Sequence, residues 1–223
     1  MSDNIDLQML MRQKAVRAVQ MLARRHQPRL IILYGSVARG DVTENSDIDI
    51  ACFCHSPLVS KDIGVFEGSR LDAWIYDITD LDPQRDDFLR FGGGEVLLED
   101  GIDGVDFLAR IQARINQGPG ELQEDSHLHL IEWINNMLQR AAGDTVEAHF
   151  RRCWLPCELL EIYFQLRCRW YLGSKQSFEW LRVHDRESFD LFQQCYCFPG
   201  EMELIKQLVK RVTAVDSKHD GCS

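Results

Sequence analysis

The sequence predicts an α+β fold, with a small mixed β-sheet domain followed by an α-helical bundle domain. In the first half, short apolar runs alternate with turn residues, whereas apolar residues recur at helical spacing through most of the second half. The run Gly118-Pro119-Gly120 separates the two patterns and would end a helix. We therefore expect a catalytic domain over residues 1–118 and a helical domain over residues 119–223.

The first domain is expected to begin with a helix and a buried strand. Residues 7–25 place apolar side chains at helical spacing and end on two arginines, and Gln27-Pro28 then stops the helix. The apolar run Leu30–Leu33 predicts a strand that is buried on both faces.

Further strands and two helical segments complete the predicted sheet domain. Strands are expected over residues 47–53 and 71–78, followed by a helical stretch from about 80 to 90. Residues 95–98 predict a strand at a sheet edge, and the spacing of apolar residues over 107–115 predicts a helix.

Three apolar stripes at helical spacing, over residues 130–138, 155–170 and 204–212, define the predicted helical domain. Pro156 is expected in the first turn of the second of these helices, where its missing N–H would leave no bond unmade.

Composition and charge narrow the class of function. The net charge of -10, with 35 acidic and 25 basic residues, disfavours long nucleic acid as a substrate, because such proteins usually carry a basic face. An acidic balance is compatible with a small cationic acceptor, although a solvated acidic surface that aids solubility is the simpler explanation.

Location is predicted from the N-terminus and the cysteines. The N-terminal MSDNID is polar, and no apolar run near it is long enough for a membrane span. The eight cysteines include no CxxC pair, which favours free thiols in a reducing compartment over a zinc site. We expect a cytoplasmic protein without a membrane partner.

The segment that follows the first strand has the features of a phosphate site. A strand that ends at Gly35-Ser36 and turns directly into a helix leaves backbone N–H groups free for phosphate oxygens. Gly35 would let the backbone approach closely, and the Ser36 hydroxyl adds a donor. Arg39 is expected either to contact a phosphate or to pair with a nearby acid.

Three aspartates on neighbouring strands predict a magnesium site. Asp47 and Asp49 are two residues apart, so their side chains leave the same face of a strand. Paired carboxylates repel each other unless a cation lies between them, and such hard ligands suit Mg²⁺. Asp72 on the next strand would complete a two-metal site and could accept a proton from the acceptor. Asp77 would face the other way on a regular strand and is the second choice.

The run Gly35-Ser36-x-Ala38-Arg39-Gly40, joined to Ser46-Asp47-Ile48-Asp49-Ile50, resembles the signature of the DNA polymerase β-type nucleotidyltransferase superfamily. The resemblance is strongest to small bacterial members and aminoglycoside nucleotidyltransferases. It implies that Gly35 and Ser36 bind the triphosphate of ATP or another nucleoside triphosphate. It also implies that Asp47 and Asp49 hold Mg²⁺.

A weaker resemblance concerns the second half. The run Arg169–Lys175 is similar to part of the helical domain of aminoglycoside adenylyltransferases, in which a lysine after a helix-ending glycine reaches the nucleotide phosphates. This implies that role for Lys175. A glutamate of the helical domain serves as general base in kanamycin-modifying relatives, so Glu161 is a candidate counterpart, with a solvated helix face as the alternative.

Together these features predict Mg²⁺-dependent transfer of AMP from ATP to the hydroxyl of a small, cationic acceptor such as an aminoglycoside. One alternative is a protein that nucleotidylates or binds a partner protein, as minimal nucleotidyltransferases paired with toxins do. Another is a catalytically idle nucleotide-binding regulator. A homodimer or a partner protein is compatible with each of them.

Overall fold

The computed structural model describes residues 2–214, and side chains from residue 5 onward. The chain forms two compact units that divide between Asn116 and Gln117. The first contains a mixed five-stranded sheet and the second is helical, so the predicted fold class is confirmed.

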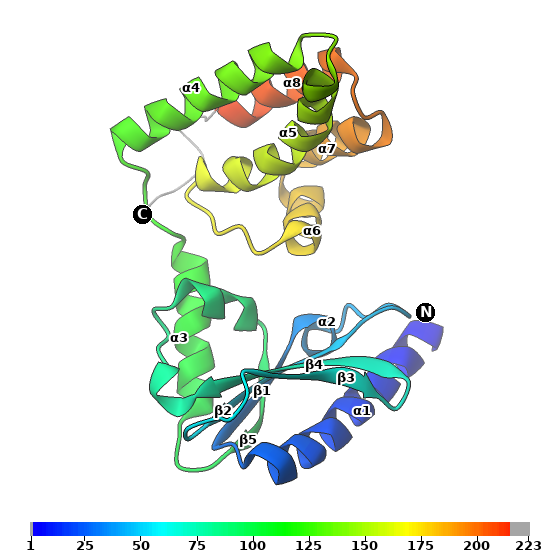
Figure 1. The fold of residues 1–223 in the computed structure, drawn as a ribbon, viewed down its shortest axis with the longest axis vertical. Helices are drawn as coiled ribbons and strands as arrows, with labels where there is room; N and C mark the ends of the chain where they lie inside the picture. Colours follow the sequence, from blue (N-terminus) through cyan, green and yellow to red (C-terminus); the bar gives the residue numbers. More distant parts are fainter. Residues whose placement is uncertain (1, 215–223) are drawn as a thin grey trace. The chain divides into compact units, whose positions relative to one another are not determined.

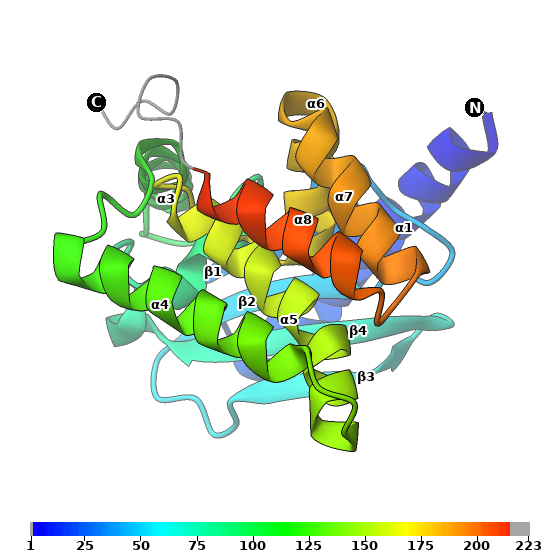
Figure 2. The ribbon, with the colours of Figure 1, turned by 90° about the horizontal axis from the view of Figure 1, so that it is seen from above.

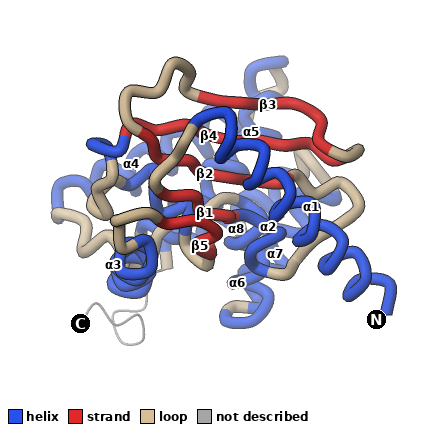
Figure 3. The backbone as a smooth tube through the Cα atoms, turned by 90° about the horizontal axis from the view of Figure 1, so that it is seen from below, coloured by secondary structure: helices blue, strands red, loops and turns tan. Residues whose placement is uncertain are grey.

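The sheet of the first unit has the strand order β3-β4-β2-β1-β5 (Figure 3). Strands β2 and β4 are parallel, whereas the other neighbouring pairs are antiparallel. The strands are β1 (Leu30–Tyr34), β2 (Ile48–Cys54), β3 (Lys61–Phe66), β4 (Ser69–Asp77) and β5 (Glu95–Glu99).

Alternating side chains give the sheet two different faces. Helix α1 (Ser2–His26) covers one face (Figure 1), where Leu22, Ile48 and Ile50 are fully buried. The other face carries an aromatic core with Phe53 at its centre, packed against the 3₁₀ helix η2 (Asp86–Phe91) and helix α3 (Gly104–Gln117). Residues of β2 and β4 that do not point to α1 therefore point to this aromatic side.

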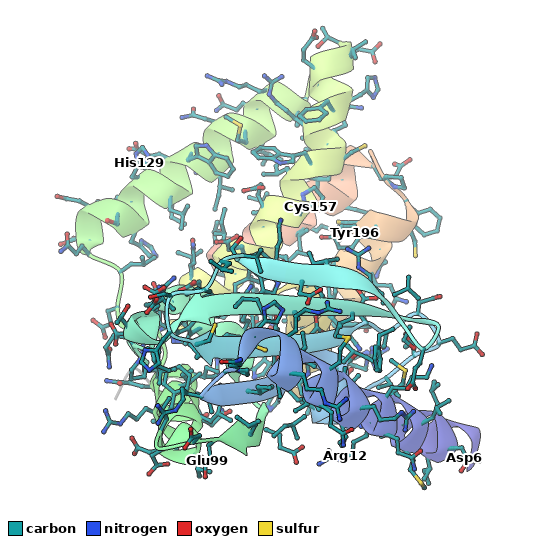
Figure 4. All side chains as sticks on the ribbon, turned by 60° about the horizontal axis from the view of Figure 1, so that its bottom comes forward. Asp6, Arg12, Glu99, His129, Cys157 and Tyr196 are labelled. Carbon is teal, nitrogen blue, oxygen red and sulfur yellow. The ribbon has the colours of Figure 1, made fainter. Side chains whose placement is uncertain are left out.

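Polar contacts fix α1 to the rest of the first unit. Arg12, labelled in Figure 4, pairs with Glu95 of β5 at 2.5 Å. The side chain of Gln8 donates a 2.7 Å hydrogen bond to the carbonyl of Val37, in the short helix α2 (Gly35–Arg39). Helix α2 is thereby fixed at the end of β1.

The structure of this unit differs from the prediction at two places. Strand β3 was not predicted, because as an exposed edge strand it lacks a buried face and therefore an apolar alternation. The expected helix over 80–90 is replaced by two 3₁₀ helices, η1 (Ile78–Asp80) and η2. The side chain of Asp77 caps η1 by accepting from Thr79 N at 2.9 Å, and Pro83 lies in the turn between them.

The second unit is built around helix α5 (Val146–Gln165), which packs against α4, α7 and α8 (Figure 2). Leu155, Leu159 and Phe192 contribute to its buried core. No helix within residues 2–214 is long and apolar enough to cross a membrane. The other helices are α4 (Glu124–Ala141), α6 (Ser174–His184), α7 (Arg186–Cys197) and α8 (Met202–Thr213).

A partly buried polar network joins α5, the start of α7 and α8. The Tyr163 hydroxyl donates to Asp185 Oδ2 at 2.6 Å, and Arg211 Nη2 donates to Asp185 Oδ1 at 2.8 Å. Arg167 lies with its guanidinium carbon 3.9 Å from the centre of the Tyr163 ring, and it donates to the carbonyl of Val212 at 3.1 Å. The hydrogen bonds of Arg167 to the carbonyls of Val212 and Arg211 satisfy groups at the end of α8 that have no partner within the helix.

The structure also corrects two details of the second half. Pro156 lies in the interior of α5, because that helix begins at Val146, where Thr145 caps it by accepting from Ala148 N at 3.2 Å. The missing N–H of Pro156 removes the donor for the carbonyl of Arg152. Gly173 does not end a helix: α5 has already ended at Gln165, and Gly173 precedes α6.

Candidate active site

Helix α2 follows β1 without a connecting loop. Gly35, its first residue, has a φ of 71°, a left-handed conformation that favours glycine. The N–H groups of Gly40 and Asp41 both donate to the carbonyl of Ser36, at 2.9 and 3.1 Å, and so end the helix. Gly35 and Ser36 therefore lie at the strand-to-helix bend where the sequence predicts phosphate binding.

The bend lies directly against a carboxylate. Asp49 is the register partner of Tyr34, the residue before Gly35. A Cβ placed on Gly35 would overlap Asp49 Oδ2 and would lie 2.9 Å from Asp49 Cγ. The absence of a side chain at residue 35 thus provides the space for the carboxylate.

Asp49 and Asp72 are neighbours across the parallel pair β2 and β4. Residues paired in this way place their side chains on the same face of the sheet, so Tyr34, Asp49 and Asp72 form a row across three strands. The Asp72 Oδ1 atom is buried and has no hydrogen-bond partner among the described residues. A buried carboxylate oxygen without a partner is unfavourable unless a ligand supplies one.

Asp47 lies immediately before β2. Its Oδ2 atom is 3.5 Å from Arg70 Nε, and both side chains are substantially exposed, at 41% and 60%. Exposed pairs of this kind contribute little to stability. Asp47 can therefore leave Arg70 at small cost.

The environment of Asp49 disfavours its charged form. Burial, followed by the negative charges of Asp47 and Asp72, raises the pKa of Asp49 to about 6. Arg39 and Arg90 act in the opposite direction but do not compensate. The carboxylates are thus close enough to repel one another, which is the condition under which a bound cation is favourable.

No group of three or more histidine, cysteine, aspartate or glutamate side chains within the described part of the chain is arranged so that it could hold a metal ion. The chemistry of the donors nevertheless fits Mg²⁺, because Asp49 and Asp72 offer hard oxygen ligands and one of these oxygens has no hydrogen-bond partner in the described chain. That Asp47, Asp49 and Asp72 together ligate the metal stays a prediction.

Arg39 lies at the end of α2. Its Nε atom is 3.4 Å from Asp41 Oδ1, which is the pairing with a nearby acid that the sequence allowed. The aliphatic part of its side chain passes over Gly93, where an added Cβ would lie 3.3 Å from Arg39 Cγ. Its predicted contact with phosphate stays a prediction.

Arg90 is a residue of this site that the sequence did not indicate. It comes from η2, and its guanidinium carbon lies 5.0 Å from the ring centre of Trp74 and 5.7 Å from that of Tyr34. Its positive charge acts on Asp49. The only sequence signal was an arginine beside two aromatic residues, Phe88 and Phe91, and that signal does not point to a distant aspartate.

The remaining predicted residues belong to the second unit. Lys175 is exposed near the start of α6, and Glu161 is exposed on α5, where it accepts from Gln165 Nε2 at 3.4 Å. The predicted phosphate contact of Lys175 and the predicted basic role of Glu161 stay predictions.

Comparisons with known proteins identify a family for part of the chain. Residues 16–100 match the family described as nucleotidyltransferase domain. No curated protein matches the chain. Among solved structures, a nucleotidyltransferase-like protein from Exiguobacterium sibiricum 255-15 is similar at 12% identity, with a TM-score of 0.45, over 89% of this chain and 74% of that one.

Proposed function

Residues 16–100 form a nucleotidyltransferase domain of the DNA polymerase β-type superfamily, and on this premise we propose that the protein transfers AMP from ATP to an acceptor hydroxyl, in a Mg²⁺-dependent reaction. The acceptor oxygen attacks the α-phosphorus in line, the bond from the α-phosphorus to the bridging oxygen breaks, and pyrophosphate leaves.

One observation carries this proposal: two carboxylates in register, Asp49 and Asp72, lie beside a strand-to-helix bend whose first residue is a glycine. The carboxylate of Asp49 fills the space that a side chain at residue 35 would occupy. The position of this acid therefore depends on a glycine at the bend. A turn with an unrelated solvated aspartate would not require this fit.

The proposed roles follow from the positions of these residues. Asp49 and Asp72, with Asp47, would hold Mg²⁺, which supplies positive charge for the triphosphate and for the transition state. Backbone N–H groups at Gly35 and Ser36 would bind phosphate oxygens, with Arg39 as a further cationic contact. The buried oxygen of Asp72, which has no hydrogen-bond partner in the described part of the chain, supports a role in accepting the proton of the acceptor hydroxyl. Positioning and charge neutralisation would supply most of the rate enhancement.

We further propose that the acceptor is small and cationic, as an aminoglycoside is. The net charge of -10 supports this choice, because it favours the approach of a polycation and disfavours long nucleic acid. The thiols of Cys52, Cys54 and Cys195 are free and buried, which supports a reducing, cytoplasmic location.

Transfer from α-labelled ATP in the presence of Mg²⁺ tests the proposal. The label should move to an aminoglycoside in a panel of polycations, and transfer to the protein itself would instead indicate a protein hydroxyl as the acceptor. Asp49→Asn and Asp72→Asn should each reduce transfer by at least a hundredfold.

Asp77→Asn is a matched control for this test. Asp77 lies on the same strand as Asp72, but its carboxylate binds the N–H groups of Thr79 and Ser56, at 2.9 and 3.0 Å. This variant should keep near-normal transfer. Full activity in a folded Asp49→Asn or Asp72→Asn protein would refute the assignment.

A further inference from the structure

We propose that Arg90 is a positioning residue that serves as a built-in counter-cation for the Asp49 and Asp72 carboxylates and competes with a divalent metal for them. The inference rests on the proposed function, since it concerns the same carboxylates. It assigns a role to a residue outside the strand-to-helix bend and the three aspartates.

Arg90 is surrounded by aromatic rings. Its guanidinium carbon lies 5.0 Å from the ring centre of Trp74, 5.4 Å from that of Phe91, 5.7 Å from that of Tyr34 and 5.9 Å from that of Tyr76. The Tyr76 hydroxyl also accepts a hydrogen bond from Arg90 Nη2. The ring contacts and this hydrogen bond hold the cation in place.

The same rings place the guanidinium beside the acids. Tyr34 is the register partner of Asp49, and Trp74 follows Asp72 by two residues on the same face of β4. The guanidinium that contacts both rings therefore lies on the aromatic face that also carries the two carboxylates.

Among the described residues, no direct ion pair neutralises the charge of Arg90. Within residues 5–214 its guanidinium forms no contact with a carboxylate close enough to count as a salt bridge, and its buried Nε has no hydrogen-bond partner in this part of the chain. Arg90 is partly buried, and a cation withdrawn from water is costly unless nearby negative charge compensates for it. Asp49 and Asp72 supply that charge at longer range.

This arrangement predicts the direction in which the affinity for metal changes when the charge of Arg90 is removed. A cation held close to the carboxylates repels a second cation, so removing the Arg90 charge should strengthen metal binding. Loss of a merely structural residue would have the opposite effect, because carboxylates that are less well positioned bind metal more weakly.

The test is the affinity of the nucleotide-free protein for Mn²⁺, measured by the electron paramagnetic resonance signal of free Mn²⁺ at low ionic strength. Arg90→Gln and Arg90→Met should bind Mn²⁺ on the order of tenfold more tightly than the wild type. Arg90→Lys keeps the charge and should stay close to the wild type.

Arg85→Gln is the matched control. Arg85 immediately precedes η2 and stacks on Phe88, with its guanidinium carbon 4.6 Å from the ring centre, but it pairs directly with Asp87 at 2.8 Å. Removing this charge should change Mn²⁺ affinity by no more than about twofold, because Asp87 already compensates it.

Unchanged or weaker Mn²⁺ binding in the folded neutral variants would overturn the inference, as would tighter binding in Arg90→Lys. If neither neutral variant folds, nuclear magnetic resonance of the wild type decides. The Arg90 Nε signal should shift as Mg²⁺ is added, and a signal that stays fixed while Mg²⁺ binds would overturn the inference.

Absence of Mn²⁺ binding in the wild type and in every variant would also overturn it. The transfer assay with ATP tests the proposed function separately, since the triphosphate itself supplies metal ligands there. A failure of the Arg90 inference is thus distinguishable from a failure of the proposed activity.

Discussion

The carboxylate of Asp49 fills the space in which a side chain at Gly35 would lie. Gly35→Ala would bring its Cβ within 2.9 Å of Asp49 Cγ, and closer to Oδ2, at a residue whose φ of 71° already disfavours any side chain. We expect a loss of about 1–3 kcal/mol in the free energy of unfolding, measured by denaturant titration, since overpacking and backbone strain add. Transfer activity should fall by at least a hundredfold, because the carboxylate must move.

Gly40→Ala separates these two effects. Gly40 has a similar φ of 86°, but no atom lies within 4 Å of an added Cβ. This variant should therefore share the cost of strain and keep most of its activity. Equal activity in the two variants would show that the contact between Gly35 and Asp49 is not important for transfer.

The ionised Asp49 carboxylate is predicted to lower the free energy of unfolding of the metal-free protein. Because burial and the charges of Asp47 and Asp72 raise its pKa to about 6 in the folded state, above its value in the unfolded chain, folding becomes less favourable as pH rises through this range. Asp49→Asn should stabilise the metal-free protein by about 1–3 kcal/mol above pH 7, although it should reduce transfer by at least a hundredfold. The gain should shrink as pH falls from about 6 towards 4. Denaturant titrations at several pH values measure this difference, and a destabilised variant at pH 8 would contradict the prediction.

The sequence could predict the parts of the fold that local pattern determines. The buried run at β1, the aspartate alternation in β2 and the apolar alternation in β4 were sufficient to predict three strands. The neighbouring positions of Asp49 and Asp72 also follow, once β2 and β4 are taken as adjacent strands. The confirmed fold class depends on these same elements.

The parts that could not be predicted depend on tertiary contacts. Strand β3 gains its order from pairing with β4, and its own side chains are largely exposed, so its sequence carries no clear periodicity. Arg90 acquires its place from the rings of Tyr34, Trp74 and Tyr76, which come from two strands far from it in sequence. Pro156 is tolerated inside α5, where the buried core around Leu155 and Leu159 offsets the lost backbone hydrogen bond.

Phe53 should be a major contributor to the stability of the first unit. Its ring centre lies 5.1 Å from that of Tyr76, 5.7 Å from that of Phe88 and 6.0 Å from that of Phe107, and it is fully buried. Phe53→Ala should lower the free energy of unfolding by about 3–5 kcal/mol, because it creates a cavity among these rings.

Phe150→Ala is the control. At a side chain that is 65% exposed, it should change the free energy of unfolding by less than about 0.5 kcal/mol. A loss below about 1 kcal/mol for Phe53→Ala, measured by denaturant titration, would show that the aromatic core can collapse around the cavity.

Asp185 is predicted to make the second unit sensitive to acid. Burial alone would raise its pKa, but hydrogen bonds from Ser188, Tyr163 and Arg211 lower the pKa to about 2. A carboxylate whose folded pKa lies below its unfolded value stabilises the protein at neutral pH, and this contribution is lost as pH falls from about 4 towards 2. Asp185→Asn should therefore cost about 1–2 kcal/mol at pH 7, a value reduced by the partial exposure of the group, and almost nothing near pH 2.

Asp190→Asn, which removes only the exposed pair with Arg186 at 2.8 Å, should cost less than about 0.5 kcal/mol at either pH. Unfolding of the two variants, followed by circular dichroism at pH 7 and at low pH, measures this difference. If Asp185→Asn lowers the free energy of unfolding equally at both pH values, packing around Asp185, rather than its charge, stabilises the network.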